Sequence, residues 1–336
     1  MYLTFYGLAE KPFNATPDPK FLYLTPGHRE ALAQLLYGVN ERKGFIVLTG
    51  EVGTGKTTLL HALLQRLDRT TAVAFIFNST LPFDGLLEYI LEDFRIAKTG
   101  DTQAQRLFAL NSFLTKRRRA GRNTVLILDE AQNLEPPTLE QVRLLSNFET
   151  PTEKLLQILL VGQPELEDKL ALHELRQLRQ RISLQCSIPP LTPAETREYI
   201  RTRLCIAGGN ALGLFTDQAV ARISEYAKGI PRVVNVVCDH CLLYGYAEQK
   251  RKIDRDIVKQ AVQYLQGNRP QRRAPGVPQS RWTTPLRWIL GALAVVPVGW
   301  LALLALGPDA LVNASSLVGA YLFDLARSLR DLFDIR

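Results

Sequence analysis

The sequence has few cysteines, and their pattern is not one that stabilises a secreted domain. Four occur in 336 residues, at Cys186, Cys205, Cys238 and Cys241. A small secreted scaffold needs several closely spaced pairs, so a disulfide framework is excluded. Cys238 and Cys241 are spaced like half of a zinc site, but no second close pair accompanies them. They share one face of a helical pattern, and we expect them to be buried there.

Acidic residues are absent from a stretch near the C-terminal end, and this absence accounts for much of the positive charge. Residues 267–287 hold five arginines, four prolines and no acid, which is typical of a linker. Residues 307–336 hold four Asp and three Arg, so residues 1–266 keep only +4 of the net charge of +8. The composition therefore gives little support to a nucleic-acid-binding surface on the folded region.

Charge of either sign is absent from residues 288–306, which are mostly apolar. A helix of this length spans about 28 Å, close to the hydrocarbon core of a bilayer. We expect a transmembrane helix here, with the arginine-rich flank and the preceding domains in the cytoplasm. We expect no signal peptide, because no charged and then apolar stretch opens the chain. The tail, 307–336, has the spacing of an amphipathic helix; a poorly ordered tail and a re-entrant hairpin are the alternatives.

A phosphate-binding loop is the most specific motif. It lies between an apolar run at 45–49 and a helical pattern, and it comprises Gly50, Glu51, Val52, Gly53, Thr54, Gly55, Lys56, Thr57 and Thr58. Strand, glycine loop and helix follow one another in the order that this motif requires. The glycines let backbone N–H groups face phosphates, Lys56 can reach the β- and γ-phosphates, and the Thr57 hydroxyl can bind magnesium. The sequence therefore predicts ATP and Mg²⁺ as cofactors.

Two acidic residues follow a second apolar run, at 125–128. Four consecutive apolar residues fit a strand that is buried on both faces of a parallel sheet. We expect Asp129 to hold the magnesium ion and Glu130 to orient and deprotonate the attacking water. Together with the phosphate-binding loop, this pair predicts an enzyme that hydrolyses ATP.

The apolar patterns divide the chain into an α/β region and a helical region. Further strands are expected at 73–77 and 157–161, with helices at 28–41, 85–94 and 103–119; from residue 191 only helices are expected, at 193–207, 216–227, 231–249 and 254–265. The fold class is therefore α/β, with a parallel sheet covered by helices. The expected domains are 1–190 for nucleotide binding, 191–266 for a small helical lid, 267–287 for the linker, 288–306 for the transmembrane helix and 307–336 for the tail.

The order of these motifs resembles that of AAA+ ATPases, in particular the ExeA-like, general secretion pathway protein A family. The resemblance covers residues 1 to about 266 and rests on the phosphate-binding loop, on Asp129-Glu130-Ala131-Gln132 and on short motifs at 5–8, 11–13, 16–19, 21–23, 28–32, 161–164 and 229–232. It implies that the opening segment packs near the adenine, that Gln163 senses the γ-phosphate and the lytic water, and that Arg232 reaches back from the lid. It also implies an arginine that acts on the neighbouring subunit's site. Arg176, Arg179 and Arg181 are candidates at the end of the helix before the lid, and Arg181 best matches the family position.

Relatives of the ExeA type carry a peptidoglycan-binding domain after the membrane span, whereas only 30 residues follow residue 306 here. We therefore expect a short form without that domain. The resemblance implies a homo-oligomeric ring, single-pass in the bacterial inner membrane, that drives assembly or remodelling of an envelope secretion, pilus or polysaccharide-export machine. Two alternatives stay open. One is a DNA-associated AAA+ regulator of the transposition type; the modest net charge and the expected membrane span argue against it. The other is a non-catalytic nucleotide-dependent scaffold; the presence of Glu130 argues against it.

Overall fold

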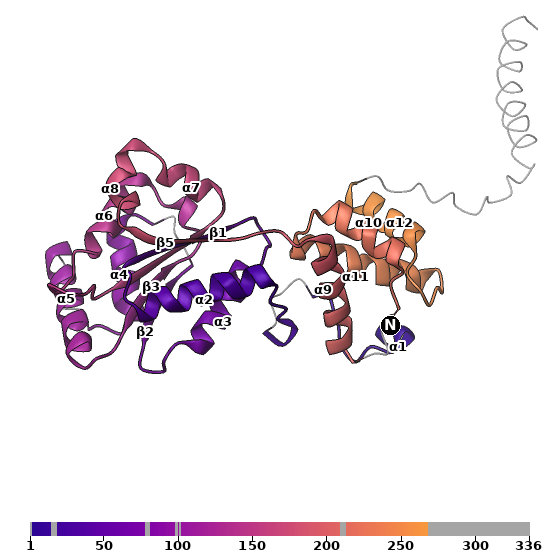
Figure 1. The fold of residues 1–336 in the computed structure, drawn as a ribbon, viewed down its shortest axis with the longest axis horizontal. Coiled ribbons are helices and arrows are strands. Elements are labelled where there is room, and N and C mark those ends of the chain that lie inside the picture. The colour runs from indigo at the N-terminus through magenta and orange to yellow at the C-terminus, as the bar shows by residue number, and fades with distance from the viewer. Residues whose placement is uncertain are drawn as a thin grey trace, which may run out of the picture. The chain divides into compact units, whose positions relative to one another are not determined.

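The structure is a computed structural model that describes residues 2–14, 19–77, 81–97, 100, 102–208 and 213–267. They belong to one compact unit, 1–270. Five strands form its sheet: β1 (Phe45–Gly50), β2 (Ala72–Ile76), β3 (Thr124–Leu128), β4 (Gln157–Gly162) and β5 (Ile182–Ile188). They are all parallel and lie in the order β2-β3-β4-β1-β5 (Figure 1).

Helices alternate with these strands along the chain. They are α2 (Pro26–Asn40), α3 (Lys56–Arg66), α4 (Phe83–Asp93), α5 (Gln103–Arg119), α6 (Pro136–Leu145), α7 (Glu165–Leu170) and α8 (Arg176–Arg179), with short 3-10 turns η1 (Pro19–Phe21), η2 (Ala131–Asn133) and η3 (His173–Leu175). The predicted parallel sheet with helices is therefore confirmed. The strands expected at 45–49, 73–77, 125–128 and 157–161 correspond to β1–β4 within one residue at each end.

Alternate residues of the central strand β1 lie on opposite faces of the sheet. Ile46 and Leu48 belong to a buried cluster with α2 and α3, whereas Phe45 and Val47 belong to a second cluster with α4–α8. Every residue of β1 and β4 is buried. Burial on both faces is the reason why these strands are continuous apolar runs, and it stabilises the sheet by about 25 cal/mol per Å² of apolar surface.

Strand β5 is a correction to the sequence-based expectation, which places the arginine candidates on a helix that leads directly to the lid. In the structure α8 ends at Arg179, and β5 lies between α8 and the helical region. It pairs with β1 at the edge of the sheet. Its apolar residues alternate with polar ones, at Ile182, Leu184, Cys186 and Ile188. Alternation of this kind is the pattern of a strand with one solvated face, and it is weaker than the continuous runs of β1, β3 and β4.

The helical region contains α9 (Pro193–Ile206), α10 (Asp217–Ala227), α11 (Pro231–Ala247) and α12 (Arg255–Leu265). Its core also takes in the start of the chain, including α1 (Tyr2–Tyr6). The Tyr2 hydroxyl donates to Asp239 Oδ1 over 2.7 Å, and the Ala9 N–H donates to Ala207 O over 2.8 Å. The opening segment thus packs with the lid helices, although it precedes the sheet in sequence.

Cys238 and Cys241 are fully buried on α11, within the core of the helical region. Burial raises the pKa of both thiols above the usual range, so they stay protonated at neutral pH. Within the described ranges, no group of three or more His, Cys, Asp and Glu side chains is placed to hold a metal ion. Packing, as expected from the helical pattern, is the role that this geometry gives them.

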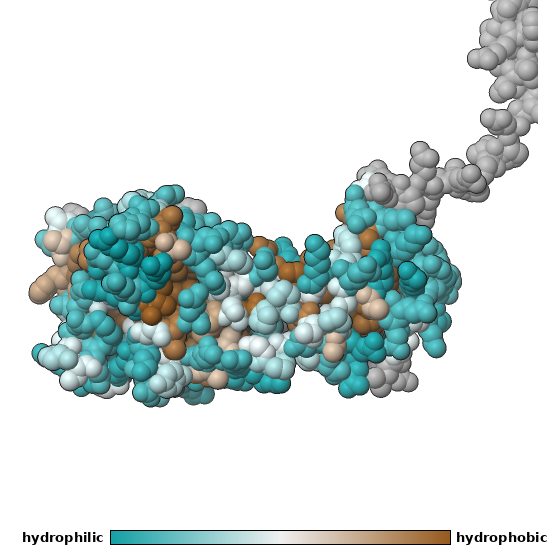
Figure 2. Space-filling model, turned by 45° about the horizontal axis from the view of Figure 1, so that its top comes forward, coloured by the Kyte–Doolittle hydropathy of each residue, from teal (hydrophilic) through white to brown (hydrophobic). Residues whose placement is uncertain are grey.

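The expected membrane segment cannot be compared with the structure. The expected linker beyond Gly267, the helix at 288–306 and the tail at 307–336 lie outside the described residues. Among the helices that the structure describes, none is long and apolar enough to cross a bilayer. In the view of Figure 2, hydrophilic residues cover most of the described surface.

Gly229, in the turn between α10 and α11, offers a test of the packing at the start of the lid. Its φ is +74°, and a Cβ here would lie 2.2 Å from Leu191 O. Gly229→Ala should therefore lower the free energy of unfolding by about 2–4 kcal/mol. Gly121→Ala is the matched control, because Gly121 has a φ of +73° and nothing within 4 Å of the added Cβ. Its cost should be about 1 kcal/mol. Urea unfolding measures both free energies. Equal losses of stability in the two variants would show that the close approach to Leu191 does not contribute to the cost.

Candidate nucleotide-binding site

The phosphate-binding loop begins at the last residue of β1 and ends in the first turn of α3. Two of its glycines have backbone angles that side chains disfavour, with φ of +82° at Gly53 and +103° at Gly55. A Cβ on Gly50 would lie 2.9 Å from Thr54 Oγ1 and 3.1 Å from Ile188 O. The glycines are therefore required by both conformation and space, as the sequence predicts for a loop whose N–H groups face an anion.

Lys56 is folded back onto this loop. Its Nζ donates to Gly50 O over 2.7 Å and to Glu51 O over 3.1 Å. Burial lowers the pKa of Lys56, while the carboxylates of Glu130 and Asp129 act in the opposite direction. The ammonium group is thus held at the mouth of the loop by carbonyls that phosphate oxygens can replace.

The acid pair follows β3, as expected, and its two members have different environments. Asp129 is buried, and burial raises its pKa, with Lys56 opposing the rise. Its backbone N–H donates to Ile76 O over 3.0 Å, and its Oδ1 accepts the Glu130 N–H over 2.9 Å. Its carboxylate is therefore fixed at the end of the strand, where a cation would reduce the cost of burying the charge.

Glu130 points toward Gln163, the residue that directly follows β4. Its backbone is left-handed, with φ of +52° and ψ of 37°, and its Oε2 accepts the Gln163 Nε2–H over 3.1 Å. Burial alone would raise the pKa of Glu130, but hydrogen bonds from Gln132 and Gln163 and the charge of Lys56 lower it overall. The carboxylate is consequently charged at neutral pH and able to accept a proton.

Gln132 is a residue of this site to which the sequence assigned no role. Its Nε2 donates to Glu130 Oε2 over 2.6 Å, and its Oε1 accepts the Gln163 backbone N–H over 3.1 Å. One amide therefore joins the acid that follows β3 to the residue that follows β4. A Cβ on Gly162 would lie 2.8 Å from this Oε1, so the neighbouring position must be glycine. The sequence signal was its place at the end of the motif Asp129-Glu130-Ala131-Gln132, two residues after Glu130.

His28 is a second residue that the sequence left without a role. Its Nε2 lies 3.0 Å from Thr54 O in the phosphate-binding loop, and its Nδ1 lies 2.6 Å from Thr25 Oγ1. Burial lowers the pKa of His28, although the Thr54 carbonyl and the charge of Glu195 oppose the shift. The neutral ring, with its proton on Nε2, satisfies both contacts, and it fixes the loop to the start of α2.

The loop lines a pocket of about 320 Å³. Its other walls come from residues 21–24 of the opening segment and from the lid helices α9 and α11, and its members include Val52, Thr57, Thr58, Glu130 and Arg232. The lid touches the loop directly, because the Arg232 N–H donates to Gly53 O over 3.3 Å. Backbone donors, an ammonium group, a hydroxyl and nearby carboxylates form a set that fits a nucleoside triphosphate with a divalent cation.

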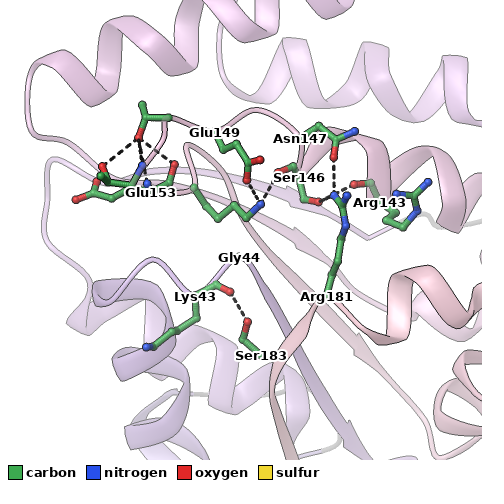
Figure 3. Close-up of polar contacts among 12 residues, drawn as sticks. Lys43, Gly44, Arg143, Ser146, Asn147, Glu149, Glu153, Arg181 and Ser183 are labelled. Carbon is green, nitrogen blue, oxygen red and sulfur yellow. Dashed lines mark hydrogen bonds and ion pairs between the residues drawn. The ribbon is translucent and has the colours of Figure 1, made fainter.

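Arg181 is not brought to this pocket. It precedes β5, and the parallel register pairs Phe45 with Ile182 and Gly50 with Ile188, so Arg181 lies at the opposite end of the strands from the loop. Figure 3 shows its guanidinium against the end of α6, where Nη1 donates to Ser146 Oγ and to Asn147 Oδ1, each over 2.6 Å. Arg176 and Arg179 are exposed on α8.

Comparison with known proteins identifies the family to which this sequence is similar. Residues 39–170 match the family model of an AAA domain. General secretion pathway protein A of Aeromonas hydrophila is 40% identical over 301 residues, which is 89% of this chain and 53% of that protein. Over the part that these comparisons cover, the chain is an ExeA-like AAA+ protein. It has the fold and the nucleotide-binding loop of an NTPase, and it spans about half the length of that relative.

Other likenesses concern smaller regions or the fold alone. An uncharacterized HTH-type transcriptional regulator of Methanocaldococcus jannaschii is 28% identical over 145 residues, 42% of this chain and 35% of that protein. The crystal structure of Cdc6p from Pyrobaculum aerophilum has a TM-score of 0.56 at 19% identity, covering 74% of this chain and 71% of that chain. The ORC2 protein of Aeropyrum pernix has a TM-score of 0.55 at 19% identity, covering 75% and 71%. These two structures share the fold of this ExeA-like chain.

The hydrogen bond from Gln132 should influence any chemistry performed by Glu130. Because this bond favours the charged carboxylate, Gln132→Ala should raise the pKa of Glu130. The carboxylate then takes up a proton at a higher pH, so the acidic limb of the kcat profile for nucleotide hydrolysis should move to higher pH. The kcat at the optimum should fall roughly 10-fold, because the Glu130 carboxylate loses its fixed position.

Gln141→Ala, at an exposed position of α6, is the matched control and should leave the profile unchanged. Nucleotide affinity should be the same in both variants. An unshifted acidic limb in Gln132→Ala would contradict the role of this hydrogen bond.

Proposed function

We propose that this chain is a membrane-anchored AAA+ ATPase that hydrolyses ATP to drive assembly or remodelling of an envelope secretion, pilus or polysaccharide-export machine. The observation that carries the hydrolysis is the position of Glu130, which lines the pocket of the phosphate-binding loop and accepts the Gln163 amide. A charged carboxylate beside the phosphates supplies the general base that a nucleotide-dependent scaffold does not need.

Each group around the phosphates has a distinct proposed role. The loop N–H groups and the N-terminus of α3 hold the phosphates, and Lys56 moves from the loop carbonyls to the phosphate oxygens. Thr57 and Asp129 hold a magnesium ion, which when bound neutralises charge on those oxygens. Glu130 accepts a proton from the attacking water at its carboxylate, and Gln163 orients this water.

Two arginines are proposed to complete the site in the transition state. Arg232 lies on the lid of the same chain, in contact with Gly53. Arg181 lies roughly 17 Å from the level of the loop, because five residue steps of β1 separate the two at about 3.3 Å each. A site on a neighbouring subunit is the one that it can serve, and this supports a homo-oligomer arranged as a ring.

The cellular setting is proposed from two observations. The 40% identical relative is named for general secretion, which supports a client in the cell envelope. The uncharged run at 288–306, with arginines before it, supports a single-pass anchor in the bacterial inner membrane and an ATPase domain in the cytoplasm. Envelope proteins at that membrane are therefore the proposed partners.

Hydrolysis can be separated from binding with two variants of the purified full-length protein. Lys56→Ala should abolish nucleotide binding, because the ammonium group is lost from the phosphate site. Glu130→Gln should bind ATP as the wild type does and hydrolyse it roughly 100-fold or more slowly, because only the general base is removed. Release of phosphate and binding of a fluorescent ATP analogue measure the two effects. Wild-type turnover in Glu130→Gln would reject the mechanism.

The proposed action of Arg181 across subunits predicts complementation. Arg181→Ala and Lys56→Ala should each be inactive alone, whereas a mixture should recover part of the activity at interfaces that pair an intact Lys56 with an intact Arg181. Arg176→Ala, which changes an exposed arginine on α8, is the control and should keep its own activity. The mixtures are assayed at several ratios after co-assembly has been verified by crosslinking. Absence of recovery in co-assembled samples would mean that Arg181 does not act in trans.

A further inference from the structure

The edge of the sheet opposite the nucleotide pocket gathers three loops that are distant in sequence. Helices that cross between parallel strands run back along the sheet, so their C-termini and the starts of the next strands meet at this edge. The loop 41–44 contacts the loop 120–123 through Arg42, whose Nη2 donates to Gly121 O over 3.2 Å. The loop 67–71 adjoins the same loop, since the Ala72 N–H donates to Asn123 O over 3.1 Å. The three loops therefore form one continuous surface.

Five exposed cations lie at this edge, and we call them the basic edge: Arg66, Arg69, Lys116, Arg119 and Arg122. In the described part of the chain, none of the five forms an ion pair. Two exposed acids, Glu41 and Asp68, lie in the same loops, so the surface keeps an excess of positive charge.

Structural needs account for other cations of this region but not for the basic edge. Arg42 and Arg118 both pair with Glu153, over 2.7 and 2.5 Å. Arg117 donates from Nε to Thr124 Oγ1 over 3.1 Å and from Nη2 to Asn123 O over 2.8 Å. One or two cations are enough to balance the dipole at the end of a helix, whereas the last turn of α5 holds four. The remaining cations are exposed, and no ion pair joins them to any other residue that the structure describes.

We propose that the basic edge docks on the anionic lipid headgroups of the leaflet next to which the chain is anchored. The proposal rests on the proposed membrane anchor. The twenty linker residues 268–287 span at most about 70 Å, so an anchored domain stays close to that leaflet. There, each Lys or Arg at the surface gains attraction from acidic lipids. Cations in the last turns of α3 and α5 and in the loops that follow them suit point contacts with many headgroups. The nucleotide pocket lies at the opposite ends of the strands, so docking in this way leaves the pocket away from the bilayer.

Fluorescence resonance energy transfer from the full-length protein to lipids of the vesicle that holds it tests the proposal. The donor fluorophore is attached at Ala120→Cys, within the basic edge, in a background with Cys205→Ser, because Cys205 is the exposed native cysteine. The acceptor is a labelled headgroup lipid. Vesicles contain either phosphatidylcholine alone or phosphatidylcholine with about one-third phosphatidylglycerol, a composition with strong negative surface potential.

Two triple variants provide the matched comparison. The first replaces three cations of the basic edge by glutamine: Arg69, Lys116 and Arg119. The second replaces three exposed cations of the lid by glutamine: Lys252, Arg255 and Lys259. Transfer should be higher in anionic than in neutral vesicles, and added salt should reduce it. The first variant should weaken docking roughly 100-fold, because each cation near an anionic leaflet contributes about fivefold. The second should behave as the unmodified protein does.

Three results would overturn the proposal. Transfer could be equal in the two kinds of vesicle, or both triple variants could lose it to the same extent. The third is binding of a fluorescent DNA duplex that the first variant abolishes while transfer to lipid is unaffected; the edge would then be a nucleic-acid surface.

An alkaline wash of the vesicles separates this inference from the anchor on which it rests. Protein that stays with the vesicles supports the anchor. If the wash releases it, the anchor proposal fails. Flotation of the released protein with vesicles then tests whether the basic edge binds lipid without an anchor. Binding to anionic vesicles that the first variant loses would support docking without an anchor, whereas binding retained by that variant would reject it.

Discussion

The pairing of β1 between β4 and β5 is the constraint on which the nucleotide site depends. Parallel strands end at the same edge, so the loop after β1, the acids after β3 and Gln163 after β4 meet there despite their distance in sequence. β3 does not pair with β1, because β4 lies between them. This order leaves Gln163 between the phosphate-binding loop and Glu130, where a single side chain can respond to both.

Electrostatics give two adjacent carboxylates opposite properties. Burial raises the pKa of Asp129, whereas the amides of Gln132 and Gln163 and the charge of Lys56 lower that of Glu130. The Asp129 carboxylate is costly to bury as an anion, so it gains most from a nearby cation. The Glu130 carboxylate is charged and held in a fixed geometry, so it is suited to accept a proton. The roles that we propose for Asp129 as metal ligand and for Glu130 as general base therefore rest on these different surroundings, and not on residue type.

The same topology separates charge along the sheet. Lys56 and Arg232 lie at the pocket beside the carboxyl ends of the strands, whereas the basic edge, whose cations form no ion pair within the described residues, lies at the other ends of the strands. A net charge of +4 for residues 1–266 conceals this separation, because a sum over the sequence carries no position. Composition alone therefore gives the net charge of residues 1–266 correctly but does not reveal the positive potential of one surface.

The sequence by itself determined the elements whose signals are local. Continuous apolar runs identify β1, β3 and β4, and the glycine pattern identifies the loop, since both depend on neighbouring residues. The linker, the transmembrane helix and the tail stay predictions of the same kind. Only the tertiary structure decided that the opening segment packs with the lid through Tyr2 and Asp239, that β5 extends the sheet, that Gln132 joins Glu130 to Gln163, and that Arg181 is remote from its own loop. These features depend on contacts between residues far apart in the chain, and a single sequence does not encode such distances in any local pattern.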